Sequence, residues 1–256
     1  MFAACIKRVE KADSEIRTNL KGELRTMTSK EILEDINGIF QEKWETRAGR
    51  KVPETGDLKL GNDAIILSGT VLYADMAEST NLVNNFKSPF AAEVYKAYLL
   101  GACRVIRDNS GEITAFDGDR VMAVFIGDYK NTSAAKTALQ INYLVRQIND
   151  SIKQTYTTTA YSLRQAVGID TSELFVARTG IRNSNDLVWV GRSANYAAKL
   201  CGLGTADFPS YITEDVFTKL NDEGKFGGTP RRLMWEKRIW TATGTVVYRS
   251  NFWWPF

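Results

Sequence analysis

Two aspartates stand where apolar segments end, and their carboxylates have the chemistry of metal ligands. Asp75 follows the strand-like residues 71–74, and Ser79 or Thr80 can cap a helix after it. Asp119 closes an Asp-Gly-Asp turn between two apolar segments, which is a hairpin pattern. Asp75 by itself is most simply a solvated residue. If the first strand and the hairpin lie side by side in one sheet, however, the two carboxylates can hold divalent cations together with a phosphate ligand.

The composition excludes several other chemistries. The 256 residues contain no His, which rules out His nucleophile activation and His metal ligands. The three Cys are far apart and odd in number, so they predict neither a disulfide framework nor a zinc site, and they favour a reducing cytoplasm. The 33 Lys and Arg against 30 Asp and Glu leave a net charge of only +3, which argues against a nucleic-acid-binding surface. No apolar run is long enough for a signal peptide or for stable membrane insertion.

The composition along the chain predicts three parts. Residues 1–62 are an N-terminal helical extension and linker, with two amphipathic helices followed by a Gly- and Pro-containing stretch. Residues 63–221 are the central domain, which contains both aspartates, and residues 222–256 are a C-terminal extension with strand-like segments and an aromatic end. That aromatic end most simply covers an apolar patch of its own domain or of a dimer, and a membrane or another partner is the alternative.

The central part predicts an α/β (α+β) fold. A strand that ends at Asp75 precedes a helical segment at 82–107, a hairpin at 113–125 and a helix at 133–149. Strand-like segments at 162–169, 174–177 and 187–190, and a helix that begins after Gly191, complete the order. Strand, helix, hairpin, helix, strand is the ferredoxin-like βαββαβ plan, in which the first strand and the hairpin are neighbours.

Four blocks of the sequence stand in the order and spacing of one enzyme family. They are Leu72-Tyr73-Ala74-Asp75-Met76-Ala77-Glu78-Ser79-Thr80, Phe116-Asp117-Gly118-Asp119 with Ala123-Val124-Phe125, Val167-Gly168-Ile169-Asp170, and Val190-Gly191-Arg192-Ser193-Ala194-Asn195-Tyr196-Ala197-Ala198-Lys199-Leu200. Together they resemble the class III nucleotidyl cyclases over residues 64–205. Each block alone is common, and the shared order makes the resemblance specific.

The resemblance implies a class III cyclase core that works as a homodimer on a nucleoside triphosphate. Asp75, Asp119 and the carbonyl of Met76 would hold two Mn²⁺ or Mg²⁺ ions. The backbone N–H groups around Ala77, Glu78, Ser79 and Thr80 would hold the triphosphate. The other subunit would supply Asn195 to orient the ribose and Lys199 to neutralise charge at the reacting phosphorus.

Two departures from the family pattern concern recognition of the nucleotide base. Ala115 and Val188 occupy the positions where family adenylate and guanylate cyclases carry polar purine-reading residues. Apolar side chains cannot pair with a purine edge, so the base is read elsewhere or is a pyrimidine. With the helical N-terminus and the Trp253-Trp254 tail, this resembles the pyrimidine cyclases of the Pycsar anti-phage systems, which make cyclic UMP or cyclic CMP as a signal.

That narrower resemblance implies a uridylate cyclase with UTP as the favoured substrate, and cytidylate and adenylate cyclases remain alternatives. Tyr73 faces the same side of its strand as Asp75, so it lines a base or ribose pocket or else packs in the core. Arg178 and Arg182 could reach phosphates or a uracil carbonyl, and the commoner fate of such residues is solvation. A downstream effector would respond to the cyclic nucleotide without contacting the enzyme.

One position keeps two further readings open. The family normally has Arg where this chain has Lys199, and an ammonium lacks the planar fork of a guanidinium. Arg192 could contribute the missing charge. If neither residue does so, the chain is a catalytically silent nucleotide-binding regulator on the same fold. A scaffold whose terminal extensions bind another protein is the third reading.

Overall fold

A computed structural model describes residues 28–256, and the chain divides into two units, whose described parts are residues 28–43 and 44–256. The first unit contains helix α2 (Ser29–Gln41). Thr28 caps this helix, and its hydroxyl accepts a hydrogen bond from the backbone N–H of Glu31. The second of the two predicted N-terminal helices is therefore confirmed, and the first lies outside the described residues.

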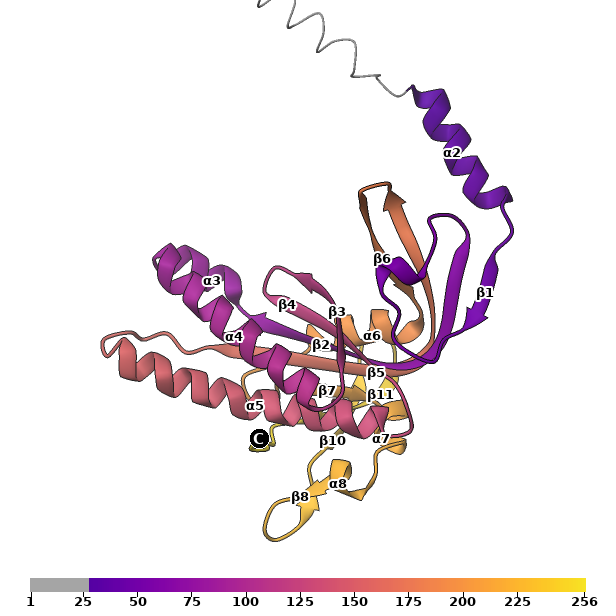
Figure 1. Ribbon diagram of the computed structural model, residues 1–256. Helices are drawn as coiled ribbons and strands as arrows, with labels where there is room; N and C mark the ends of the chain where they lie inside the picture. The colour runs from indigo at the N-terminus through magenta and orange to yellow at the C-terminus, as the bar shows by residue number, and fades with distance from the viewer. Residues whose placement is uncertain (1–27) are drawn as a thin grey trace, which may run out of the picture. The chain divides into compact units, whose positions relative to one another are not determined.

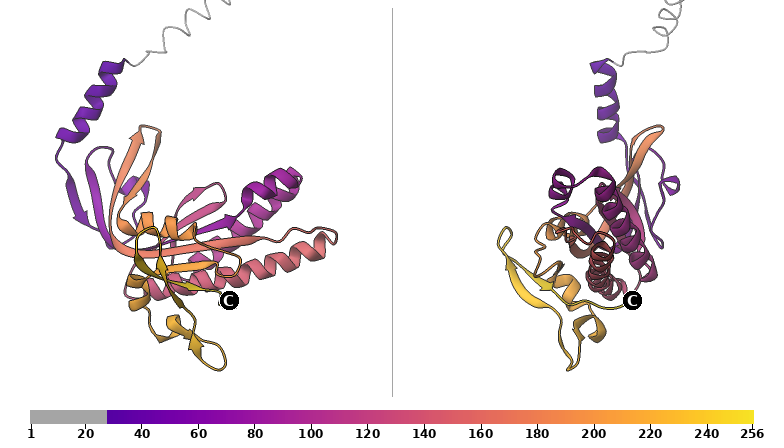
Figure 2. Two further views of the ribbon diagram at one scale, coloured as in Figure 1. Left: turned by 180° about the vertical axis from the view of Figure 1, so that it is seen from behind. Right: turned by 90° about the vertical axis from the view of Figure 1, so that its left-hand side faces the viewer.

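The second unit is built on one large mixed sheet (Figure 1). Its strand order is β10-β11-β7-β5-β2-β4-β3, with β1 paired to β2 and β6 paired to β5. The strands are β1 (Glu45–Ala48), β2 (Asp63–Ala77), β3 (Glu112–Asp117), β4 (Arg120–Phe125), β5 (Arg164–Ile181), β6 (Ser184–Val190), β7 (Ser210–Thr213), β10 (Glu236–Trp240) and β11 (Thr245–Ser250). A separate small sheet pairs β8 (Phe226–Gly227) with β9 (Arg232–Leu233). Beyond the sheet, β5 and β6 continue as a two-stranded arm (Figures 1 and 2).

Helices lie on both faces of this sheet. They are α3 (Ser79–Asn85), α4 (Ser88–Asp108), α5 (Lys130–Thr155), α6 (Arg192–Cys201), α7 (Glu214–Thr218) and α8 (Asp222–Lys225), with a 3₁₀ turn η1 (Thr55–Asp57). The long helices α4 and α5 run side by side and bury the face of β2 that carries Ala74 and Met76. Helix α6 packs against the other face, which carries Val71 and Tyr73. Successive β2 residues therefore point to different layers, as the pleat requires.

The βαββαβ prediction is confirmed by β2, α4, β3, β4, α5 and β5 in that order, and the mixed sheet confirms the α/β (α+β) class. Three local predictions were wrong. The segment 82–107 is two helices, because the chain breaks at Phe86 and Lys87. The strand-like pieces at 162–177 form the single strand β5. Neither Ser79 nor Thr80 caps α3, because Glu78 occupies the capping position.

Both ends of the second unit belong to the large sheet. Strand β1 lies within the segment predicted as extension and linker, and it pairs in parallel with the start of β2. Strand β11, from the predicted C-terminal extension, pairs with β7. The proposed boundaries at residues 62 and 221 stay predictions. Among the described helices, none has the length and apolarity needed to cross a membrane.

The aromatic C-terminus lies along α5 of its own chain. The backbone N–H of Trp254 donates to the carbonyl of Leu139 at 3.0 Å, and Asn142 Nδ2 donates to the carbonyl of Phe252 at 2.7 Å. The Trp253 ring stacks on Tyr143 with centroids 5.7 Å apart. The tail thus covers a helix of its own domain, the simplest of the predicted roles.

Candidate active site at the end of strand β2

The end of β2 and the β3–β4 turn bring the two predicted metal-binding carboxylates together. Asp75 pairs with Arg120 across the β2–β4 ladder, and Asp119 directly precedes Arg120 in the turn. Gly118 supports this turn with a φ of +61°, a conformation that glycine adopts without steric cost. The hairpin prediction is therefore confirmed, and it sets Asp119 beside Asp75.

The electrostatics of Asp75 are those of an ion site. Burial, followed by the neighbouring charge of Asp119, raises the pKa of the Asp75 carboxyl from 3.8 to about 6. The opposing charge of Arg120 lowers this pKa without cancelling the effect. Burial beside a like charge disfavours the ionised Asp75 carboxylate, and a cation held between Asp75 and Asp119 would stabilise it.

The donor set fits hard divalent cations. No group of three or more Asp, Glu, Cys or His side chains forms anywhere in residues 28–256, so two carboxylates are the side-chain ligands on offer here. Backbone carbonyls such as that of Met76, phosphate oxygens and water are the oxygen ligands that would complete a magnesium or manganese shell. The arrangement suits an ion shared between protein and phosphate.

Arg120 is a site residue that the sequence analysis missed. Its guanidinium lies 5.3 Å from the centre of the Tyr73 ring and donates to Asp117 at 2.7 Å. Its buried Nε has no hydrogen-bond partner within the described part of the chain. A cation beside an aromatic ring, with a spare donor, can bind a planar base that carries carbonyl groups. Its position directly after Asp119 was the available signal.

The loop after Asp75 has the backbone shape expected of an anion site. Glu78 has φ +59° and ψ +32°, a left-handed conformation that residues other than glycine and asparagine seldom adopt. An unusual conformation of this kind is maintained by its surroundings, and the Glu78 carboxylate accepts from Arg164 at 2.6 Å. Turns with such a residue point successive N–H groups to one side, where they can bind phosphate. Ala77, Ser79 and Thr80 flank this turn.

Asn195 and Lys199 lie on α6 with exposed side chains. Asn195 Nδ2 makes a long 3.5 Å contact with the carbonyl of Gly191, one turn earlier in the chain. No described hydrogen bond or ion pair connects either side chain to Asp75 or Asp119 of the same chain. In this chain α6 presents both side chains outward.

Close backbone packing fixes α6 against the sheet. A Cβ on Gly168 would lie 2.1 Å from the carbonyl oxygen of Ala197 and 2.4 Å from the nitrogen of Cys201. Only glycine therefore allows β5 to approach the helix this closely. This contact gives a physical reason for the Val167-Gly168-Ile169 block found in the sequence.

The two positions linked to base recognition lie at opposite ends of β2. Ala115 pairs with Met122, which in turn pairs with Tyr73, so Ala115 belongs to the Asp75 end. Val188 pairs with Ala177 of β5, whose partner on β2 is Ala64. At about 3.3 Å per residue, Ala64 lies roughly 35 Å along the strand from Asp75. One chain cannot bring Val188 to its own carboxylates.

The arm contains the two predicted arginines. Arg178 Nε donates to Asn185 Oδ1 at 2.8 Å, and its Nη1 donates to the carbonyl of Leu58 at 3.2 Å. It therefore braces the base of the arm. Arg182 is exposed at the tip, between β5 and β6. Both residues lie far from Asp75 of the same chain.

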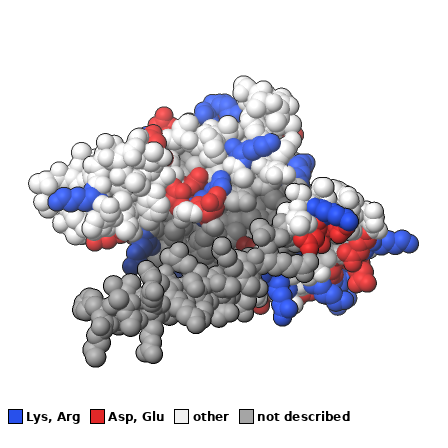
Figure 3. Space-filling model, turned by 90° about the horizontal axis from the view of Figure 1, so that it is seen from above, with Lys and Arg blue, Asp and Glu red and all other residues white. Residues whose placement is uncertain are grey.

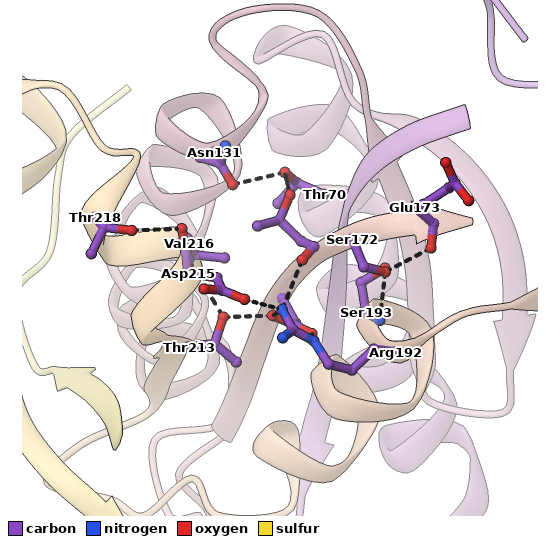
Figure 4. Close-up of polar contacts among 12 residues, drawn as sticks. Thr70, Asn131, Ser172, Glu173, Arg192, Ser193, Thr213, Asp215, Val216 and Thr218 are labelled. Atoms are coloured by element: carbon purple, nitrogen blue, oxygen red, sulfur yellow. Dashed lines mark hydrogen bonds and ion pairs between the residues drawn. The ribbon is translucent and has the colours of Figure 1, made fainter. Parts of the chain in front are cut away.

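Arg192 lies at the start of α6, where its guanidinium is held by Asp170, Asp215 and the carbonyl of Thr171 (Figure 4). Its charge is thus directed toward its own subunit. Lys199 is left as the cation of α6 that has no ion pair among the described residues.

The charges on the face seen in Figure 3 are interspersed. Basic and acidic groups alternate over the described residues of that face, without a continuous basic surface. This distribution differs from the basic stripe that nucleic-acid binding requires.

Comparisons with known proteins point to one family. No protein-family model matches the chain. The chain is 47% identical over 238 residues to a uridylate cyclase of Xanthomonas perforans. The matched region covers 92% of this chain and 98% of that protein. It is also 47% identical over 221 residues to a uridylate cyclase of Burkholderia cepacia, covering 86% and 95% of the two chains. Among solved structures, the guanylyl cyclase Cya2 superposes with a TM-score of 0.61 at 16% identity, over 72% of this chain and 92% of that one.

Proposed function

Since the chain belongs to the uridylate cyclase family and has the class III nucleotidyl cyclase fold, we propose that it converts UTP into 3′,5′-cyclic UMP and pyrophosphate at a site shared by two copies. In this reaction the ribose 3′-oxygen forms a bond to the α-phosphorus, and the bond from that phosphorus to the β-phosphate bridging oxygen breaks. Pyrophosphate leaves, and the hydroxyl proton passes to solvent.

The juxtaposition of Asp75 and Asp119 is the observation that carries the proposal. Burial, followed by the charge of Asp119, raises the pKa of Asp75 to about 6, and divalent cations that neutralise the pair would stabilise its ionised form. Bound Mn²⁺ or Mg²⁺ would supply charge neutralisation at the phosphates and favour ionisation of the 3′-hydroxyl. The chain itself holds the two carboxylates in fixed positions on β2 and the β3–β4 turn.

The turn around Glu78 would bind the triphosphate. Its backbone N–H groups, from Ala77 to Thr80, follow Asp75 directly, so phosphates bound there lie beside the carboxylates. Glu78 does not face the phosphates in this proposal. Its carboxylate pairs with Arg164 and thereby maintains the turn.

The base would lie beside Tyr73 and Arg120. The Tyr73 ring offers a stacking surface, and the Arg120 guanidinium has an unpartnered Nε that can donate to a uracil carbonyl. Ala115, two strands away from Tyr73, leaves room without offering a partner for a purine edge. Cytosine presents a donor amino group where uracil presents a carbonyl, so a guanidinium at that position favours UTP over CTP.

The second copy would complete the site with Asn195 and Lys199. Both side chains are exposed on α6 and have no described bond to Asp75 or Asp119 of their own chain. In a twofold dimer each α6 can face the carboxylates of the partner. Asn195 would orient the ribose, and Lys199 would stabilise charge on the transferring phosphoryl group. Arg178, Arg182 and Val188 can approach a base or phosphate only from the second copy.

Incubation of the purified chain with each of the four ribonucleoside triphosphates and Mn²⁺ tests the proposal. Cyclic UMP from UTP is the expected product, identified by mass. Predominant formation of cyclic CMP or cyclic AMP would contradict the choice of base. No cyclic product from any triphosphate, with UTP bound, would instead support the silent regulator, which the Lys in place of Arg at position 199 favours.

Mixing two inactive variants tests the shared site. Asp75→Ala and Asn195→Ala each damage a different half, so a mixed dimer keeps one intact site. With random exchange, about a quarter of wild-type activity returns. Inactive mixtures with demonstrated chain exchange would contradict a shared site.

We also infer the setting from the family resemblance. Cyclic UMP would act in the cytoplasm as a Pycsar-type signal during phage infection and would activate a separate effector. Production of cyclic UMP in infected cells, and its loss with Asp119→Ala, would support this role. Infection without a rise in cyclic UMP would contradict it.

A further inference from the structure

We infer that Asp170 and Ser172, which are distant from the proposed chemistry, are positioning residues that hold α6 where Asn195 must act. This inference rests on the proposed function, because it assigns them to the half-site that α6 provides. They form no part of the Asp75 half-site.

Three alternate residues of β5 face α6, and each contacts it differently. Gly168 allows the helix backbone to approach, as described above. Asp170 pairs with Arg192 at the first position of the helix. Ser172 binds Ser193 at the second. Because residues two apart in a strand face the same side, one face of β5 forms a continuous contact surface for α6, called here its seat.

Asp170 is a fully buried carboxylate in a sheet that is otherwise largely apolar. Its side chain is 0% exposed, and it accepts from Arg192 Nε at 3.0 Å and Nη2 at 3.1 Å. Thr213 Oγ1 donates a further hydrogen bond to it. Burial raises the pKa of the carboxyl, and the bonds from Thr213 and Arg192 oppose that effect. Such a pair is stable only in a well-defined geometry, so it fixes the position of its partner more than it adds stability.

Arg192 connects the Asp170 carboxylate to the first turn of α6. Its Nη2 also donates to the carbonyl of Thr171 at 3.0 Å and to Asp215 on α7. Figure 4 shows Arg192 beside Asp215 of α7, with Thr213 at the end of β7 close by, and Thr213 acts on the guanidinium only through its bond to Asp170. A planar fork held from several directions cannot rotate freely, so the first turn of α6 has one position relative to the sheet.

Ser172 supplies the side-chain cap that the N-terminus of α6 lacks. The N-cap residue of α6 is Gly191, which has no side chain to accept a hydrogen bond from the first turn. Ser172 Oγ accepts that bond from the backbone N–H of Ser193 at 3.0 Å and lies 2.9 Å from its Oγ. The cap therefore comes from the sheet, and it ties the turn directly before Asn195 to β5.

The variant Asp170→Asn tests this inference, because it keeps the shape of the side chain and removes its charge. Asp63→Asn is the matched control. Asp63 is also a buried carboxylate, 5% exposed and paired with an arginine, Arg47, but it lies at the start of β2. Ser172→Ala is a milder second variant for the case in which Asp170→Asn folds poorly.

We expect Asp170→Asn to lower kcat by roughly ten- to a hundredfold, with the KM for UTP changed by less than about threefold, because misplacement of an orienting group acts mainly on the reacting geometry. Amide hydrogen exchange at residues 193–195 rises in Asp170→Asn and Ser172→Ala and stays at the wild-type rate in Asp63→Asn. Unchanged exchange in both β5 variants would overturn the inference.

Variant mixing assigns the half-site. Asp75→Ala mixed with Asp170→Asn should regain activity to the level of the Asp75→Ala and Asn195→Ala pair. Asn195→Ala mixed with Asp170→Asn should gain nothing above the residual activity of Asp170→Asn alone, because both defects lie in the same half. The opposite pattern would overturn the inference. Failure of the Asp75→Ala and Asn195→Ala pair, with active wild-type protein, contradicts the shared site alone, and the exchange rates then decide whether β5 holds α6.

Discussion

The two proposed half-sites of this chain are built in contrasting ways. The carboxylate half lies on β2 and the β3–β4 turn, where Asp75 is half buried beside a like charge. The helix half presents exposed Asn195 and Lys199, and its fixed part is the buried polar seat behind them. In the carboxylate half the buried charge lies on the functional groups themselves, whereas in the helix half it lies on Asp170, which supports the helix through Arg192. The first should therefore fail through its own side chains, and the second through residues that never touch the nucleotide.

The largest effect is expected where the charge is concentrated. Asp75→Ala or Asp119→Ala should lower cyclic UMP formation by about a hundred- to a thousandfold or more, because each removes a ligand that no neighbouring side chain replaces. Product measured by mass spectrometry, with circular dichroism to verify folding, checks this. Asp128→Ala, at an exposed carboxylate between β4 and α5, is the control and should keep wild-type activity.

The next effect concerns the base. Arg120→Ala should lower kcat/KM for UTP by about ten- to a hundredfold, because a carbonyl of the base loses its donor. The same change removes an opposing charge beside Asp75, so Arg120→Lys separates the two causes: it keeps the charge and loses the planar fork. Equal activity of Arg120→Lys and wild type would show that only the charge matters.

Lys199 tests whether the exposed half takes part in the chemistry. Lys199→Ala should lower kcat by roughly tenfold, while Lys199→Arg should retain activity within about threefold of wild type, since a guanidinium supplies the same charge with more donors. The matched control is Lys219→Ala, at an exposed lysine that follows α7. Unchanged turnover in Lys199→Ala would remove this residue from the proposed site.

The contrast between the halves also explains what could be predicted from the sequence. The carboxylate half is local: an apolar strand, an Asp-Gly turn and their pairing are all expressed in neighbouring residues, so Asp75 and Asp119 were found together. The seat of α6 is not local, because Asp170 meets Arg192 and Thr213 only after β5, α6 and β7 have assembled. Arg120 was missed for a related reason, since its partner Tyr73 lies on another strand.

The length of β5, the break before α4 and the conformation of Glu78 also depend on contacts that a local sequence pattern does not show. Strand β5 was read as two pieces, because the polar residues 170–173 interrupt its apolar pattern, whereas its pairing with β2 continues through them. The break before α4 is set by two residues, and the left-handed Glu78 by its bond to Arg164, neither of which leaves a periodic pattern. Periodicity predicts elements that bury one face, and it is silent where side-chain bonds decide the backbone.

The smallest expected effect is the pH dependence of the carboxylate half. The folded chain raises the pKa of Asp75 to about 6, above its ordinary value of 3.8, so between these values the folded state binds the proton more tightly than the unfolded state. The contribution of Asp75 to the unfolding free energy of the cation-free protein is therefore greatest at low pH and is lost as the pH rises toward 6. Manganese requires the ionised carboxylate, so its affinity should fall by up to about tenfold per pH unit below 6 and level off above it. Titration calorimetry at pH 5, 6 and 7 measures the manganese affinity. Thermal melts without metal, compared with those of Asp75→Asn, isolate the contribution of Asp75 protonation to stability. A manganese affinity that is flat from pH 5 to 7 would mean that Asp75 is already ionised, and the contrast between a charged half and a supported half would lose its electrostatic basis.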